Sequence, residues 1–419
     1  MMKLAVIFES SPFDRKGLFN AVHNRVKHLS ATGECTVDVF CVHSRDNAFT
    51  RRVRHTPVVP SVDEVSIDGI TYRLLWYRFS VLDNVLLEKM NLRPLFFRRF
   101  MSSRVELLKG YDAVVAHSFC GGLFALMAHQ RFNIPYYVTW HGSDVHTHPW
   151  RVPVMLEDTR AVMESARCNF FVSKALMTAS DKITVQASKE VLYNGVSEDF
   201  VEFSPADRAA VRERYGLSPE DKVVAFVGNL VPVKNVLSLP EIFAQVASRF
   251  AEVSGSLSDS CGRSARLKFW IVGDGKLRVQ LETACSESLT RHCEERSPSR
   301  HCEERSDVAI SFFGNQPSSA MPDIMNCIDV LVLPSLNEGL PLVCAEALNC
   351  GAAVVGSDVG GIAEIIGQDY VVPLGDSFAT GMADMIVSFL DGRSPSQTLP
   401  SDISWARTAA LELAALKAL

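Results

Sequence analysis

Short apolar runs alternate with amphipathic stretches along most of this 419-residue chain. In the first half, runs typical of buried strands are joined by segments whose apolar residues recur at helical spacing. The runs are KLAVIF (3–8), CTVDVFCV (35–42), YDAVVAHS (111–118) and IPYYVTWHGSD (134–144), and the helical segments include 18–33 and 121–132. Strands joined by helices in this way form a parallel, doubly wound sheet. We therefore predict an α/β fold whose ligand cleft lies at the carboxyl ends of the strands.

The same alternation starts again after a polar stretch at 204–221. Its strand-type runs are KVVAFVGNL (222–230), RLKFWIVGDG (266–275), AISFFGN (309–315), IDVLVLPS (328–335) and AAVVGSD (352–358). The pattern predicts two Rossmann-like domains, residues 1–200 and 201–395. Residues 396–419 are predicted as a C-terminal helix, which either packs back on the first domain or caps the second.

Residues 251–308 have the least fold-like sequence. HCEERSPSR and HCEERSDVA form a direct repeat at 292–309, and we expect an inserted surface loop at about 285–308. His292, Cys293, His301 and Cys302 suggest zinc as an alternative. Each His–Cys pair is adjacent, however, and adjacent side chains diverge, unlike recognised zinc spacings. The repeat therefore favours an insertion over a metal site.

Eleven cysteines are scattered through the chain, several inside apolar runs. They are typical of buried, reduced thiols in a cytoplasmic protein. We find neither a signal peptide nor an apolar run of the ~18 residues that a membrane-spanning helix needs. In KMNLRPLFFRRFMSSR (89–104), cations alternate with Leu and Phe. This segment is either an amphipathic helix on the inner, anionic face of a membrane or a partly buried helix with a solvated basic face.

Glu338 and Glu346 stand eight positions apart in the most informative segment, LPSLNEGLPLVCAEALNCGAAVVGSDVGG (333–361). Pro341 suits the first turn of a helix, and Gly351 suits its exit. Glu338 should then lie in the loop before the helix, with Glu346 one to two turns inside. Backbone N–H groups from Gly339 onward suit a phosphate, and a carboxylate suits vicinal hydroxyl groups. The segment predicts a site for a phosphorylated sugar, whereas two solvated glutamates are the simpler alternative.

Other polar or small residues follow predicted strands, where a doubly wound sheet binds ligands. They are Gly17, His117, His141, Asp144, Asn229, Lys234 and the turn Gly273-Asp274-Gly275. Taken singly, each residue also has an ordinary structural explanation: the histidines as buried core residues, and the Gly-Asp-Gly segment as a turn. A Walker motif and a G-x-G-x-x-G after the first strand are both missing, which argues against a P-loop NTPase and a dinucleotide oxidoreductase.

As an ordered set, these motifs resemble the retaining GT-B glycosyltransferases of the group-1 family, family 4 of the sugar-transferase classification. The set comprises VVAHSFCGGLFALMA, IPYYVTWHGSDV, VLYNGV, VGNLVPVKN, FWIVGDGKLR, FFGN and NEGLPLVCAEALNCGAAVVGSDVGGIAEII. The resemblance covers nearly the whole chain. It implies a GT-B fold, with two Rossmann-like domains facing across a cleft. It further implies a nucleotide-sugar donor on the second domain and a glycan or lipid-linked acceptor on the first, in bacterial surface polysaccharide biosynthesis.

The resemblance also implies roles for individual residues. Glu346 would bind the ribose hydroxyls and Glu338 the transferred sugar, with Lys234 at the diphosphate. His141 would lie at the reacting sugar as the second catalytic residue beside Glu338. The remaining donor contacts would be Gly17, Asn229, Asn315, Gln316, Gly339, Leu340, Pro341 and Leu342, and the acceptor contacts His117 and Asp144. No metal, no cofactor and no nucleic-acid partner are expected, and no covalent nucleophile is assigned.

Two departures from the family pattern bear on activity. Asn229 occupies a position where the family usually has Arg, so Lys234 would meet the diphosphate without a second cation. The repeat at 292–309 falls in the donor-side domain. They keep a second hypothesis open, a catalytically impaired glycan-binding relative. A third hypothesis is a GT-B epimerase or a phosphorylase, which would need a pyridoxal-phosphate lysine.

Overall fold

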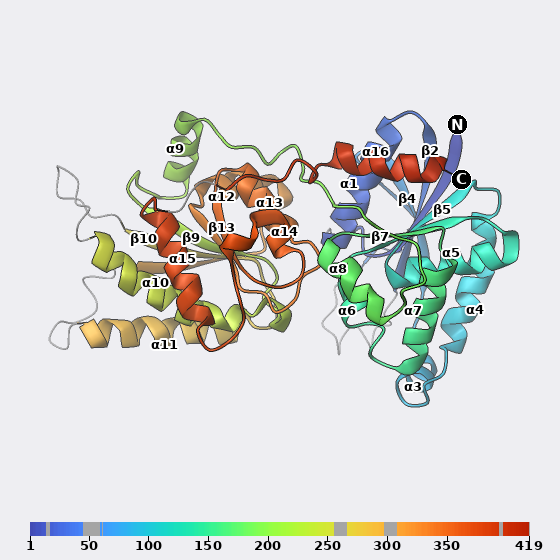
Figure 1. Cartoon of the computed structure of the whole chain (residues 1–419), viewed down its shortest axis with the longest axis horizontal. Coiled ribbons are helices and arrows are strands. Elements are labelled where there is room, and N and C mark those ends of the chain that lie inside the picture. The colour runs from blue at the N-terminus through green and yellow to red at the C-terminus, as the bar shows by residue number, and fades with distance from the viewer. Residues whose placement is uncertain are drawn as a thin grey trace. The chain divides into compact units, whose positions relative to one another are not determined.

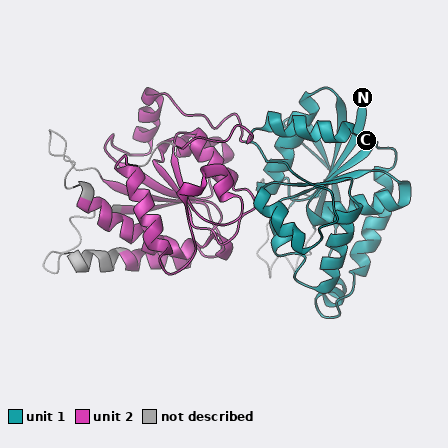
Figure 2. Ribbon diagram, viewed as in Figure 1, with its two compact units in different colours: residues 1–195, 404–419 teal, residues 196–403 magenta. Residues whose placement is uncertain are grey.

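The computed structural model describes residues 1–13, 17–44, 59–60, 62–254, 266–296, 308–393 and 397–418. They form two compact units, shown in Figures 1 and 2. Unit 1 comprises residues 1–195 and 404–419, and unit 2 comprises residues 196–403. Residues 397–403, expected with the C-terminal helix, thus belong to unit 2.

Unit 1 is built on an eight-stranded sheet in the order β3-β4-β2-β1-β5-β6-β7-β8. Only the pair β3–β4 is antiparallel. The strands are β1 (Met2–Glu9), β2 (Cys35–Ser44), β3 (Glu64–Ile67), β4 (Ile70–Tyr77), β5 (Ala113–His117), β6 (Tyr136–Trp140), β7 (Cys168–Phe171) and β8 (Lys189–Val191). The strand order reverses at β1, which lies between β2 and β5. This is the kind of position at which doubly wound sheets bind ligands.

The helices of unit 1 cover the sheet and include the chain's last element. They are α1 (Gly17–Ala31), α3 (Val81–Glu88), α4 (Leu95–Arg104), α5 (Ser118–Phe132), α6 (Ser143–His146), α7 (Pro153–Ser165), α8 (Lys174–Ala179) and α16 (Trp405–Lys417). Figure 1 shows α16 beside α1, and its Ala409, Leu413 and Leu416 are part of the unit 1 core. Gly121 lets α5 approach β1, because a Cβ there would lie 2.4 Å from the carbonyl oxygen of Ile7.

Unit 2 contains a parallel six-stranded sheet in the order β11-β10-β9-β12-β13-β14. Its strands are β9 (Lys222–Val227), β10 (Leu267–Val272), β11 (Val308–Gly314), β12 (Val330–Leu333), β13 (Ala353–Ser357) and β14 (Val371–Val372). Its helices are α9 (Pro205–Arg214), α10 (Leu239–Ser254), α11 (Arg278–Arg296), α12 (Met321–Cys327), α13 (Leu342–Asn349), α14 (Ile362–Ile366) and α15 (Phe378–Leu390). In Figure 1, α10 lies beside both α11 and α15.

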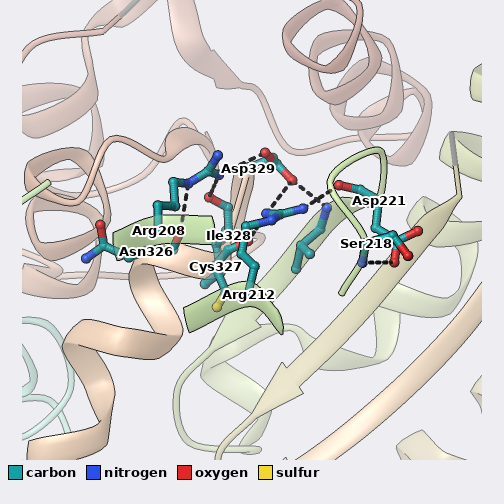
Figure 3. A network of polar contacts seen from close by, with 9 residues as sticks. Arg208, Arg212, Ser218, Asp221, Asn326, Cys327, Ile328 and Asp329 are labelled. Atoms are coloured by element: carbon teal, nitrogen blue, oxygen red, sulfur yellow. Dashed lines mark hydrogen bonds and ion pairs between the residues drawn. The ribbon is translucent and has the colours of Figure 1, made fainter. Parts of the chain in front are cut away.

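A network of hydrogen bonds and ion pairs connects α9 to the amino-terminal ends of β9 and β12, as Figure 3 shows. The Asp329 carboxylate accepts hydrogen bonds from Arg208 Nη2 at 3.0 Å and from the Val223 N–H at 2.7 Å. Arg212 pairs with Asp329 at 3.4 Å and also donates to the carbonyl oxygen of Asp221. This edge of the sheet is opposite the carboxyl ends, so the network stabilises the unit and takes no part in the candidate site.

The alternating pattern correctly predicts two parallel sheets, but several elements depart from the expectation. The pair β3–β4 and the helices α3 and α7 were not predicted. Pro341 is the N-cap residue of α13, one position before the expected first turn, whereas Gly351 has φ +81° at the helix exit as expected. The first copy of the repeat begins within α11, where a loop was expected. Residues 297–307 and the side chains of His292 and Cys293 lie outside the described part of the chain.

Candidate functional site

In unit 2, the carboxyl ends of three neighbouring strands approach one another through glycine backbones. Gly228 follows β9, Gly273 follows β10, and Gly314 ends β11. A Cβ on Gly273 would lie 2.0 Å from the carbonyl oxygen of Gly228, and the Gly273 N–H donates to the Gly314 carbonyl at 2.8 Å. A Cβ on Gly275 would lie 2.4 Å from the Leu230 carbonyl oxygen. Side chains are therefore excluded here, and the backbone itself forms this edge of the site.

Lys234 and Glu338 form an ion pair at the carboxyl ends of the adjacent strands β9 and β12. Lys234 Nζ lies 2.5 Å from Glu338 Oε1, and the two side chains are 21% and 10% exposed. The same carboxylate oxygen accepts a hydrogen bond from Ser335 Oγ at 2.6 Å. The Ser357 hydroxyl in turn donates to the Ser335 carbonyl oxygen. Charge and hydrogen bonds thus hold Glu338 in one orientation.

The loop that carries Glu338 packs against the glycine pair that follows β13. Gly360 has φ +55°, and a Cβ there would lie 1.9 Å from the Glu338 carbonyl oxygen. The Gly361 N–H donates to the Gly339 carbonyl oxygen at 3.1 Å. The two glycines are therefore required by close approach of backbone to backbone.

Glu346 lies in α13, which begins beside this loop without a side-chain cap at Pro341. Uncapped N–H groups of a first helical turn suit an anionic ligand. Burial raises the pKa of Glu346 to about 7. Burial also raises the pKa of the Cys344 thiol, and Glu338, Lys234 and Glu346 all act on that thiol electrostatically. Glu338, Lys234 and Glu346 therefore all lie within electrostatic range of one buried thiol.

The remaining predicted donor residues of unit 2 lie at the same edge of the sheet. Asn229 and Asn315 are exposed after β9 and β11. The Gln316 amide donates to the Phe313 carbonyl oxygen at 2.7 Å. Arg278 was not among the predicted residues, yet its Nη1 would lie 3.2 Å from a Cβ on Gly314. Its guanidinium bonds Asp274 and Glu282.

In unit 1, His117 ends β5 and His141 follows β6. His117 Nδ1 lies 3.1 Å from His141 Nε2, so one ring donates to the other. Burial, reinforced by the cation of Arg25, lowers the pKa of His141 to about 3 and that of His117 well below its ordinary value. Both rings are neutral at physiological pH, so they can form hydrogen bonds with a ligand but provide no positive charge for an anion.

Asp144 caps the turn that carries His141. Its carboxylate accepts from the His141 N–H at 3.1 Å and from the Gly142 N–H at 2.8 Å. Gly142 has φ +143°, a conformation that favours glycine. The Asp144 carboxylate is 4% exposed. These hydrogen bonds orient the turn that carries His141. The direct contact of Asp144 with an acceptor stays a prediction.

Arg25 is the unit 1 residue that the sequence analysis missed. Its guanidinium is 1% exposed and donates to Thr139 Oγ1 at 2.6 Å. It also lies 3.5 Å from the Glu412 carboxylate. The sequence did indicate a buried cation here, because Arg25 lies on the apolar face of α1 together with Val22 and Leu29. Gly17, at the start of α1, is exposed, and a Cβ there would meet nothing within 4 Å.

Comparisons with known proteins match both units to glycosyltransferase families. The family model described as a glycosyl transferase 4-like domain matches residues 17–195. The model described as glycosyl transferases group 1 matches residues 221–391.

Two curated relatives are each 26% identical to this chain. One is a putative teichuronic acid biosynthesis glycosyltransferase, TuaC, from Bacillus subtilis; the match covers 70% of this chain and 66% of that protein. The other is N-acetyl-alpha-D-glucosaminyl L-malate synthase from Bacillus anthracis, with 66% and 63% covered. The matches thus span slightly less than two thirds of these relatives' own length.

Solved structures share the fold. Anabaena HepE in complex with UDP has a TM-score of 0.67 at 17% identity, with 100% of both chains covered. The lipopolysaccharide outer core galactosyltransferase WaaB has a TM-score of 0.61 at 16% identity, covering 100% of this chain and 99% of that one. At these identities the likeness establishes the fold alone, which is GT-B. With both of its units matched by the family models, the chain belongs to the group 1 glycosyltransferases, family 4.

Proposed function

We propose that the protein transfers a sugar from a nucleotide-sugar donor to a hydroxyl of a glycan or lipid-linked acceptor, with retention at the anomeric carbon. One observation supports it above the others: Lys234 and Glu338 lie 2.5 Å apart beside the start of α13. A cation, a carboxylate and free N–H groups at one sheet edge match the diphosphate and hydroxyls of such a donor. Structures similar to this chain were solved in complex with UDP and UDP-glucose, and TuaC is named for teichuronic acid biosynthesis. These names support a role in bacterial surface polysaccharide biosynthesis.

Each donor contact has its own task in this proposal. Lys234 neutralises the diphosphate and stabilises the leaving group, while N–H groups between Gly339 and Leu342 bind its oxygens. Glu338 accepts hydrogen bonds from the transferred sugar, and Glu346 accepts them from the ribose. Asn315 and Gln316 contact the base. Because Glu338 and Lys234 form an ion pair, donor binding must separate the two side chains. Lys234 then contacts the diphosphate, and Glu338 contacts the transferred sugar.

In unit 1 the neutral ring of His141 contacts the reacting sugar, and His117 fixes that ring through their mutual hydrogen bond. A neutral imidazole can both donate and accept a hydrogen bond, which suits a sugar hydroxyl. Gly17 leaves open space at the start of α1, where a ligand can approach the backbone.

Calorimetry with a panel of nucleotide sugars tests the donor assignment. One member should bind, and Glu346→Ala should weaken its binding about tenfold, the worth of one or two hydrogen bonds. Glu241→Ala, an exposed change on α10, is the matched control. Absence of binding by every nucleotide sugar in the panel would contradict the proposal. Retention is tested separately, by the coupling constant of the anomeric proton in the product.

A second candidate function, binding without turnover, is favoured by the exposed and uncharged Asn229. If a missing cation limits catalysis, Asn229→Arg should raise both donor affinity and turnover. Donor binding with no turnover in both proteins would favour the binding function.

We also propose that residues 89–104 contact an anionic membrane surface. Within the described residues, no helix has the length and apolar character needed to cross a membrane. In α4, Phe97 and Met101 are buried, whereas Leu95 and Phe96 are 59% and 49% exposed. Exposed apolar side chains beside exposed cations are typical of an interfacial helix. Flotation with vesicles should therefore require anionic phospholipid, and the double change Lys89→Glu and Arg99→Glu should abolish it. Equal binding to zwitterionic vesicles would contradict the contact.

A further inference from the structure

Unit 1 contains a cavity of about 710 Å³ that does not include His117, His141 or Asp144. Glu9, Ser44 and Tyr77 line it, and they are the last residues of β1, β2 and β4. The cavity therefore lies at the carboxyl ends of parallel strands, next to the strand at which the order reverses. Ligands of doubly wound sheets bind at this kind of position.

The strand-end part of the cavity is polar. The Tyr77 hydroxyl donates to the Glu9 carboxyl group, and Ser44 adds a hydroxyl to the same lining. Burial raises the pKa of Glu9. A buried carboxyl group beside a phenol and a hydroxyl can exchange several hydrogen bonds with the hydroxyls of a sugar.

The cavity lining also includes apolar side chains and arginines. Phe97, Phe119 and Met155 contribute apolar surface to the lining. Two lining arginines already have carboxylate partners, Arg98 with Asp158 and Arg151 with Glu88. Arg78 also lines the cavity, is exposed, and forms no ion pair within the described part of the chain. The positive charge of Arg78 can therefore pair with an anionic group of a ligand.

An exposed apolar surface borders this cavity on α3, on α4 and on the turn between them. We call it the apolar ridge; it consists of Val81, Leu82, Val85, Met90, Leu92, Leu95 and Phe96, each at least 40% exposed. Val81 belongs to both the ridge and the cavity lining, and Pro94, directly before α4, also lines the cavity. A hydrogen bond of 2.9 Å from the Phe96 N–H to Asp83 joins the two helices. The ridge is therefore an ordered surface continuous with the cavity.

Taking the glycosyl transfer proposed above as its basis, we propose that this cavity binds a lipid-phosphate acceptor. The sugar of the acceptor lies among Glu9, Ser44 and Tyr77, its phosphate meets Arg78, and its apolar chain leaves along the ridge. Tyr77, Arg78 and Val81 of the lining follow one another along the chain, in the order that a sugar, a phosphate and an apolar chain have in such a lipid. A purely water-soluble glycan has no apolar chain that could contact the ridge.

Binding of farnesyl phosphate to the full-length protein tests the site without knowledge of the sugar. Titrations are repeated with Lys234→Met, so that any binding at the proposed diphosphate contact of unit 2 is recognised. Farnesyl phosphate should bind at least about tenfold more tightly than farnesol, because one charge-assisted contact is worth that much. Inorganic phosphate should show no measurable binding.

Three variants locate the binding. Asn84→Trp places a large ring in the cavity lining and should weaken farnesyl phosphate binding at least tenfold, and Arg78→Ala should bring its affinity down to that of farnesol. Leu107→Trp, a change at an exposed residue outside the lining, should leave binding unchanged. Circular dichroism identifies any variant that has lost its fold.

The outcomes separate this inference from the proposed function. Farnesyl phosphate binding that is absent, or unaffected by Asn84→Trp in a folded protein, overturns the cavity assignment. Equal affinity for farnesol and farnesyl phosphate overturns the role of Arg78. Failure of every nucleotide sugar to bind, with normal farnesyl phosphate binding, would instead remove the proposed transfer reaction.

Discussion

Arg25 and Glu412 form a buried ion pair between the first and the last helix of unit 1. Arg25 Nε lies 3.5 Å from Glu412 Oε2, and the two side chains are 1% and 0% exposed. The last segment of the chain therefore supplies the counter-charge for an arginine that also bonds Thr139 and acts on His117 and His141.

We expect Glu412→Ala to lower the free energy of unfolding by about 3–5 kcal/mol, because it leaves the Arg25 charge buried without a partner. Urea denaturation followed by circular dichroism measures this. Lys417→Ala is a change on the same helix as Glu412 and removes a solvent-exposed pair with Glu34; it should cost no more than about 1 kcal/mol. Equal stabilities for the two variants would show that the buried pair is unimportant.

The pair Lys234–Glu338 leads to a prediction about donor affinity. Lys234→Met should weaken binding of the nucleotide diphosphate by roughly 10- to 100-fold, since a hydrogen bond to a charged group is worth about 1.5–3 kcal/mol. Calorimetry in low and high salt should also show a smaller salt dependence for the variant. Arg249→Met, which removes the ion pair with Asp384, is the control for loss of a cation from unit 2. Unchanged affinity in Lys234→Met would exclude Lys234 as the diphosphate contact.

The raised pKa of Glu346 predicts how stability depends on pH. Its ordinary value is 4.5, and burial raises it to about 7 in the folded protein. The folded state therefore holds this proton more tightly than the unfolded state. The resulting stability is complete below pH 4.5 and is lost as the pH rises through 7. Glu346→Gln should remove this loss and stabilise the protein at pH 8 by up to about 3 kcal/mol. Parallel stability–pH curves for the two proteins would contradict the prediction.

The same group predicts the pH dependence of donor binding. An ionised carboxylate accepts hydrogen bonds from ribose hydroxyls better than a protonated one. With a pKa of about 7, donor affinity should rise about tenfold between pH 6 and pH 8. Glu346→Gln should bind more weakly at pH 8 and lose most of this dependence. An affinity that falls as the pH rises would argue against Glu346 as the hydroxyl acceptor.

Gly360 offers a steric test of the Glu338 loop. Gly360→Ala would place a Cβ 1.9 Å from the Glu338 carbonyl oxygen and must displace that loop. We expect weaker donor binding as well as lower stability. Gly392→Ala is the matched control, because Gly392 also has a positive φ, +75°, but open space around it. It should cost about 1 kcal/mol of stability and leave donor affinity unchanged. Equal donor affinity in the two variants would mean that Gly360 does not position Glu338.

Much of the fold could be predicted from local patterns. Buried parallel strands are continuous apolar runs, and the intervening helices carry apolar residues at helical spacing, so the two sheets were apparent without tertiary information. Glu338 and Lys234 were found for a related reason. Both lie in the segments that leave the carboxyl ends of strands, and a parallel sheet brings these ends together.

The remaining features depend on contacts between distant parts of the chain. The sequence by itself determined the alternation of elements, the family motifs and the glycines that allow backbones to meet. The tertiary structure alone decided that Glu412 lies against Arg25, that Asp144 supports His141, and that Glu9 and Tyr77 share a cavity. No local pattern encodes these pairings, because strand order and helix packing bring together side chains that are far apart in sequence, and burial then changes their charge.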